Sequence, residues 1–102
     1  MGTTSVGPGA KVVCLGEALV DLVCEEPVAG LGEASAFVPR VGGSLVNIAV
    51  CAARFGARVE MLGGAGDDEW GRWLRDRVRG EGVGTERFVL VPGGGTSHAF
   101  VA

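Results

Sequence analysis

The chain has 102 residues, of which 47% are hydrophobic. This composition predicts a packed core, in one small domain or in part of a larger one, and excludes wholesale disorder. The net charge of −3 comes without a block of like charge, which argues against nucleic acid or a membrane surface as a partner.

The three cysteines, Cys14, Cys24 and Cys51, have neither CxxC nor histidine spacing. We therefore interpret them as reduced thiols of a cytosolic protein, not as a metal site or a disulfide framework, and expect Cys14 and Cys51 in apolar surroundings. Residues 1–10 lack the apolar segment of a signal peptide and are predicted to form a flexible tail. No apolar run reaches membrane-spanning length.

The first predicted elements are extended. Residues 11–15 (KVVCL) form a short apolar run that ends at a glycine, which predicts a buried strand. Two further extended segments are predicted at approximately 19–24, with Asp21 in its middle, and 36–41. Because Pro39 lacks an N–H group, the second segment suits a sheet edge or a projecting flap.

Two helices are predicted next. The first follows Gly42-Gly43 and ends at Gly56, with apolar residues near helical spacing at Val46, Ala49, Val50, Ala53 and Phe55. The second covers residues 67–79, with acids at its start, arginines near its end, and one apolar face formed by Trp70, Trp73, Leu74 and Val78.

Further strands are predicted at residues 57–62, 88–91 and 97–102. This order of elements predicts an α/β layer architecture with a largely parallel sheet. The last strand would leave that sheet with an open edge and an uncovered face. We therefore interpret the chain as the N-terminal part of a larger domain.

Known phosphate-binding motifs do not fit the glycine-rich segments. A P-loop requires a lysine after its glycines, and the only lysine, Lys11, follows no such loop. Residues 30–35 (GLGEAS) resemble a dinucleotide fingerprint but lack its third glycine and a following helix. Residues 93–95 offer no base, lysine or helix.

Residues 62–71 (LGGAGDDEWG) contain Gly-Ala-Gly-Asp, which in a strand-to-helix junction could form an anion hole with a general base. However, Asp68, Glu69 and Trp70 follow, and these side chains would repel or crowd a phosphate. We interpret the stretch as a strand-to-helix turn with acids at the helix N-terminus.

A stronger signal lies in residues 42–49 (GGSLVNIA). Paired glycines let the backbone approach a ligand closely, and the start of the following helix favours an anion. Asn47, one turn into that helix, can both donate to and accept from a hydroxyl. The alternative is a Gly-Gly turn with Asn47 near the helix cap.

Residues 42–66 (GGSLVNIAVCAARFGARVEMLGGAG) resemble the first signature of the ribokinase-like carbohydrate kinases, also called the phosphofructokinase B family. The paired glycines, Asn47, Gly56 and Gly66 fall at the family's spacings. Matches in other segments extend the resemblance over residues 11–102: Gly16-Glu17 with Asp21, Asp67-Asp68 with Gly71, Glu81-Gly82-Val83, and residues 96–101. Leu45 replaces the small residue or proline that is usual in the family. The sequence around Asp21 is more like that of fructokinases.

The resemblance implies a ribokinase-like layered sheet with a small β-sheet lid, formed in part by the segments at approximately 19–24 and 36–41. It implies that Asp21 accepts hydrogen bonds from sugar hydroxyls and that Gly42, Gly43 and Asn47 bind the sugar from the other side. His98, the only histidine, is interpreted as structural or, together with Phe100, as lining the sugar pocket.

The resemblance further implies an ATP- and Mg²⁺-dependent cytoplasmic sugar kinase that dimerises through its lid. The family's catalytic aspartate and ATP site lie in a later part of its fold, so we expect residues 1–102 alone to contain no catalytic residue and to show no kinase activity. Fructose-like hexoses are the favoured substrates, and ribose, nucleosides and keto-deoxy sugar acids are the alternatives. The alternative is a non-catalytic, truncated α/β fragment or interaction module.

Overall fold

The computed structural model describes residues 11–102, and the predicted tail over residues 1–10 lies outside the described residues. Its main sheet has three parallel strands in the order β1-β4-β5, namely β1 (Lys11–Glu17), β4 (Arg58–Gly66) and β5 (Phe88–Val91). The predicted α/β architecture with a parallel sheet is therefore confirmed.

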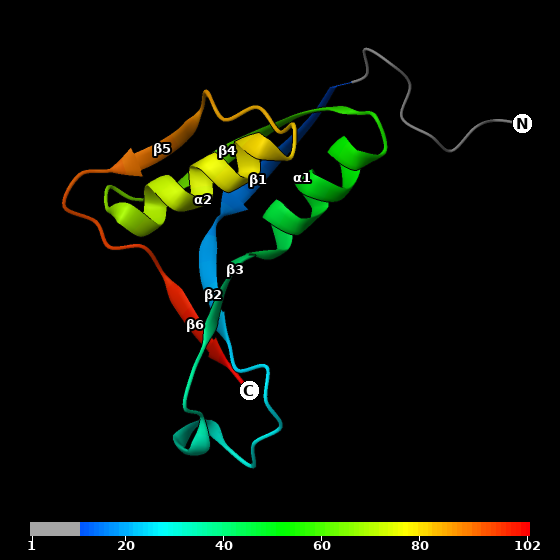
Figure 1. Ribbon diagram of the computed structural model, residues 1–102. Helices are drawn as coiled ribbons and strands as arrows, with labels where there is room; N and C mark the ends of the chain where they lie inside the picture. The colour runs from blue at the N-terminus through cyan, green and yellow to red at the C-terminus, as the bar shows by residue number, and fades with distance from the viewer. Residues whose placement is uncertain (1–10) are drawn as a thin grey trace, which may run out of the picture.

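Two helices pack on this sheet, α1 (Ser44–Arg54) and α2 (Glu69–Gly80) (Figure 1). Each begins and ends within two residues of its predicted bounds. A glycine precedes α1, and Asp68 caps the N-terminus of α2 with its side chain. Within residues 11–102, neither helix is long and apolar enough to span a membrane.

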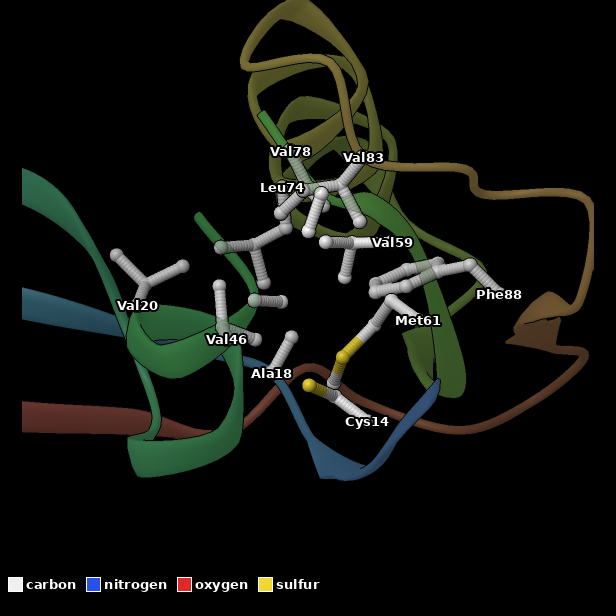
Figure 2. Close-up of a cluster of buried hydrophobic side chains, with 12 residues drawn as sticks. Cys14, Ala18, Val20, Val46, Val59, Met61, Leu74, Val78, Val83 and Phe88 are labelled. Atoms are coloured by element: carbon white, nitrogen blue, oxygen red, sulfur yellow. The ribbon is translucent and has the colours of Figure 1, made fainter. Parts of the chain in front are cut away.

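Both helices cover the same face of the main sheet. Their apolar residues converge with side chains of β1, β4 and β5 in one core (Figure 2), which contains Cys14, Val46, Ala49, Val59, Met61, Leu74, Val78 and Phe88. On the opposite face, alternate residues of β1 and β5 are exposed, namely Val13, Leu15, Val89 and Val91. This alternation is expected for strands that have only one covered face.

A second, smaller sheet extends away from the helices (Figure 1) and has the order β3-β2-β6. It consists of β2 (Leu19–Val23), β3 (Val38–Gly42) and β6 (His98–Val101), and a short 3₁₀ turn, η1 (Leu31–Glu33), lies between β2 and β3. β2 runs antiparallel to β3 and parallel to β6. Val20 of β2 is fully buried in the core and thereby anchors this sheet to the main layer.

Three sequence-based expectations need correction. The last strand, β6, pairs with β2 in the second sheet and does not extend the main sheet, because the linker after β5 carries the chain across to β2. Phe55 is not on the buried face of α1 but is 76% exposed at its end. Cys51 is also exposed, although Cys14 and Cys24 are buried and all three thiols are free.

Residues 62–71 form the strand-to-helix connection that was predicted, but the strand is longer. β4 continues through Gly66, so the turn itself is confined to Asp67 and Asp68. A Cβ atom at Gly63 would lie 1.8 Å from the carbonyl oxygen of Gly16, and one at Gly64 would lie 2.2 Å from that of Val89. The glycines therefore allow the backbones of the three parallel strands to approach one another closely at this end of the sheet.

Candidate functional site

A groove of about 560 Å³ lies at the carboxyl ends of the parallel strands. In open α/β sheets this is the usual place for a ligand. The backbone of glycines forms much of its wall, because β1 and β4 end in glycine-rich segments and the linker after β5 is glycine-rich too. The glycines that line it are Gly16, Gly63, Gly64, Gly66, Gly94 and Gly95, and Glu17 and Ser97 add polar side chains.

Asp21 and Gly42 lie next to one another in the second sheet, just beyond this groove. The antiparallel pairing places Leu19 of β2 opposite Gly42, so Asp21 and Gly42 share a face of the sheet. A Cβ atom at Gly42 would lie 2.6 Å from the Cγ atom of Asp21. Glycine at this position therefore leaves room for the carboxylate.

Gly43 joins β3 to α1 and adopts a backbone conformation that other residues rarely adopt, with φ of +108°. A Cβ atom there would lie 2.6 Å from the carbonyl oxygen of Glu17, at the end of β1. The start of α1 is thus held against the carboxyl end of the first strand, and a side chain at this position would be strained.

Asn47 lies in the first turn of α1, where its backbone N–H donates to the carbonyl oxygen of Gly43 at 3.1 Å. Its exposed side chain lines a second hollow of about 900 Å³ between α1, α2 and β3, together with Arg40, Trp73 and Arg77. Of the predicted site residues, the structure thus brings Asp21 and Gly42 into contact, places Gly43 beside Glu17, and puts Asn47 on another hollow.

Asp68 and Thr96 form a cluster of hydrogen bonds that sequence reasoning did not identify. Asp68 Oδ1 accepts from the backbone N–H of Gly71 at 2.7 Å and from the Thr96 hydroxyl at 2.6 Å. Its Oδ2 accepts from the backbone N–H of Thr96 at 3.0 Å, and Thr96 Oγ1 accepts from the backbone N–H of Gly66 at 3.2 Å. Asp68 was recognisable as a helix cap, but its partner lies 28 residues later and carries no local signal.

These bonds lower the pKa of the Asp68 carboxyl from its ordinary value of 3.8 to about 2. The Thr96 hydroxyl contributes most, followed by the backbone N–H groups of Gly71 and Thr96. Each of these donors stabilises the charged carboxylate relative to the neutral acid. Asp68 is therefore an ionised hydrogen-bond acceptor at neutral pH.

His98 and the two tryptophans contact one another through their rings. The His98 ring lies edge-on to the Trp70 ring, with 5.6 Å between the two ring centres. Trp70 and Trp73 make a contact of the same kind, also with 5.6 Å between ring centres. Trp70 and Trp73 pack against the core, as predicted. His98 is absent from the residues that line either hollow.

The Gly-Ala-Gly-Asp stretch of residues 64–67 lies at the carboxyl end of β4. Ala65 and Gly66 belong to β4, and the Asp67 carboxylate forms an ion pair with Arg72 at 2.9 Å. Among residues 11–102, no cluster of His, Cys, Asp and Glu side chains is arranged to hold a metal ion.

Comparisons with known proteins identify the family. A family model described as pfkB family carbohydrate kinase matches residues 9–102. Fructokinase-1 of Oryza sativa subsp. japonica is 40% identical over 95 residues, and Fructokinase-1 of Zea mays is 39% identical over 90 residues. These matches cover 93% and 88% of the chain, but only 29% and 28% of the two relatives.

Solved structures of sugar kinases are similar in fold to this chain. The fold matches an uncharacterised sugar kinase from Pyrococcus horikoshii with a TM-score of 0.85 and 27% identity, over 89% of this chain and 30% of that one. It matches the fructokinase of Halothermothrix orenii with a TM-score of 0.82 and 32% identity, over 89% of this chain and 32% of that one. A fructokinase from Xylella fastidiosa with bound ATP matches with a TM-score of 0.77 and 36% identity, over 88% and 28% of the two chains.

Proposed function

The chain belongs to the pfkB family of carbohydrate kinases, and from this premise we propose that residues 11–102 are the N-terminal, sugar-binding part of an ATP-dependent kinase that phosphorylates a sugar hydroxyl. The observation that carries this proposal is the carboxylate of Asp21 resting against Gly42, beside the carboxyl ends of the parallel strands. The chain spans about 29% of the length of its curated relatives, so the activity is proposed for the whole enzyme.

In this proposal, Asp21 holds the sugar by accepting hydrogen bonds from two neighbouring hydroxyl groups. Hydrogen bonds to a carboxylate are shorter and stronger than those between neutral groups. Gly42 and Gly43 present backbone rather than side chains at the same place, and the amide of Asn47 contributes both a donor and an acceptor.

The second sheet is proposed to be the lid of this site. It carries Asp21, it projects from the main layer (Figure 1), and Val20 at its base is buried in the core. A lid that excludes water protects the phosphoryl group from hydrolysis. Exposed apolar residues at its end, including Phe100 and Val101, support the proposal that two lids pair in a homodimer.

ATP is the proposed phosphoryl donor, since a similar fructokinase structure contains it. Mg²⁺ is proposed to accompany ATP because it neutralises phosphate charge in such transfers. Among residues 11–102, no group of His, Cys, Asp and Glu side chains is arranged to hold a metal ion, and we propose that these residues bind the sugar. The free thiols support a cytoplasmic location.

A fructose-like hexose is the proposed substrate. The observation that favours it is that the relatives from Oryza sativa subsp. japonica and Zea mays, at 40% and 39% identity, are fructokinases. A solved relative, the aminoimidazole riboside kinase of Salmonella enterica at 31% identity, makes ribosides the second class to test.

The test is a titration of the ¹⁵N-labelled chain with fructose, followed by amide chemical shifts around Asp21. Asp21→Asn should weaken binding by at least about tenfold, since it removes charge-assisted bonds worth roughly 1.5–3 kcal/mol. Asp67→Asn is the matched control, because Asp67 is exposed and paired with Arg72, and it should bind as the original chain does. Equal affinity of Asp21→Asn and Asp67→Asn would remove Asp21 from the site.

A further inference from the structure

The linker between the two sheets, residues 92–97, is held at a defined place by the start of α2. It leaves β5 in the main sheet and enters β6 in the second sheet, so it is one of the few covalent connections between the sheets. Gly94, Gly95 and Ser97 form part of the wall of the 560 Å³ groove. A displacement of this linker would therefore alter both the groove and the second sheet.

Thr96 is the point of attachment. Its backbone N–H and its hydroxyl both donate to Asp68, at 3.0 and 2.6 Å, and the hydroxyl oxygen accepts from Gly66 at 3.2 Å. The linker also rests directly on the end of β4, where a Cβ atom at Gly66 would lie 2.3 Å from the carbonyl oxygen of Gly94. Thr96 is buried, so leaving its hydroxyl group without these partners would cost free energy.

The attachment continues from Thr96 to Asp21. The next residue, Ser97, accepts a hydrogen bond through its carbonyl oxygen from the backbone N–H of Val20 at 2.9 Å. Val20 immediately precedes Asp21 in β2 and is fully buried. A continuous path of hydrogen bonds and covalent bonds thus runs from Asp68 through Thr96 and Ser97 to the residue before Asp21.

We propose that Asp68 and Thr96 are positioning residues, which hold Asp21 at the sugar site by attaching the inter-sheet linker to the start of α2. They act through Ser97 and Val20 and do not contact the sugar. The inference rests on the proposed function in one respect, because it takes Asp21 as the sugar-binding carboxylate. The attachment itself can be tested without any sugar.

Thr96→Val tests the attachment because it keeps the shape of the side chain and removes the hydroxyl. The Val20 amide should then exchange its hydrogen at least about tenfold faster relative to the Met61 amide, which reports opening of the core. Met61 is a suitable reference since its N–H donates to Gly84 within the main layer, at 2.9 Å. Thr96→Ser keeps the hydroxyl and should restore the original ratio.

A second variant separates the attachment from the capping of α2. Asp68→Ser retains a side-chain oxygen that can cap the helix, but this shorter side chain cannot also reach Thr96. It should therefore accelerate exchange at Val20 as Thr96→Val does, while α2 remains helical by circular dichroism. Asp67→Asn, at the adjacent exposed carboxylate, should leave the ratio unchanged.

Fructose titration of the same variants gives the functional outcome. Thr96→Val and Asp68→Ser should bind fructose at least about fivefold more weakly, as expected for a lost hydrogen bond that orients a binding group, and Thr96→Ser should bind as the original chain does. Equal acceleration of exchange at Val20 and Met61 would overturn the inference, because the cluster would then contribute only to the stability of the whole fold. No acceleration at either amide would also overturn it, because the hydroxyl group would then not hold the linker. If the original chain gives no response to fructose, the proposed function fails, and the exchange ratio still decides whether the attachment exists.

Discussion

At the scale of single residues, Asp68 shows how one side chain can serve two elements. Its carboxylate caps α2 through Gly71 and binds Thr96 through both a hydroxyl and a backbone N–H. All of these partners donate, so the charged form is favoured and the pKa falls from 3.8 to about 2. An unfolded chain has no such donors, so as the pH falls below 3.8 the unfolded chain takes up the proton first, and the folded state becomes less stable relative to it.

This difference predicts a pH dependence of stability. A lowered folded-state pKa gives stabilisation that is present in full above pH 3.8 and is lost as the pH falls through about 2. Urea denaturation from pH 5 down to about pH 2 should therefore show a steeper loss of stability for the original chain than for Thr96→Val. The carboxyl ¹³C shift of Asp68, followed over the same range, should move its midpoint upward in Thr96→Val and not in Thr96→Ser. An unchanged midpoint would mean that the hydroxyl is not the main cause of the low pKa.

At the scale of elements, α2 illustrates how local pattern and packing agree. Asp68 begins it, Arg77 and Arg79 lie in its last turn, and Leu74 and Val78 are spaced to meet the core. The charges favour the helix dipole at both ends. Trp70 and Trp73 continue the apolar face as half-buried residues, and the Arg77 guanidinium lies 5.0 Å from the centre of the Trp73 ring.

The packing of α2 predicts the effect of removing its central side chain. Leu74 is completely buried between α2 and the main sheet, so Leu74→Ala should lower the free energy of unfolding by about 2–5 kcal/mol. The matched control on the same helix is Arg72→Ala, which removes an exposed ion pair with Asp67 and should cost at most about 1 kcal/mol. Chemical denaturation followed by circular dichroism measures both, and similar losses in the two variants would contradict the assigned core.

At the scale of the whole molecule, the described part of the chain is thin, with principal extents of 50 × 37 × 18 Å. One layer of helices lies on one face of the main sheet, and the residues 11–102 leave the other face open. Parallel sheets are usually covered on both faces. The open face carries Val13, Leu15, Val89 and Val91 on neighbouring strand ends, and an exposed apolar surface of this kind favours association or the binding of apolar dyes.

The open face predicts that this chain binds the dye anilinonaphthalene sulfonate while it is folded. Leu15 is 72% exposed, so Leu15→Lys should reduce dye fluorescence and change the free energy of unfolding by only about 0.5 kcal/mol. Phe55→Lys is the comparison, since Phe55 is equally exposed but lies at the end of α1, away from this face. Dye fluorescence that falls more in Phe55→Lys than in Leu15→Lys would show that the sheet face is not the binding surface.

By itself, the sequence determined the elements and the family. The period of apolar residues, the glycines that end helices and strands, and the acids at the start of α2 are local features, so both helices and most strand positions could be predicted from them. The spacing of Gly42, Gly43, Asn47 and Gly66, together with the matches in other segments between residues 11 and 102, predicted the family to which the chain belongs. None of these features requires knowledge of which segments meet in space.

Only the tertiary structure decided how the elements meet. It placed β6 beside β2 in a separate sheet, brought the Asp21 carboxylate against Gly42, and joined Asp68 to Thr96. It also showed that Asn47 lines a different hollow from the groove at the strand ends. Strand pairing and side-chain hydrogen bonds between residues 20 or more positions apart depend on the path of the whole chain, and a local pattern of residue types does not contain that path.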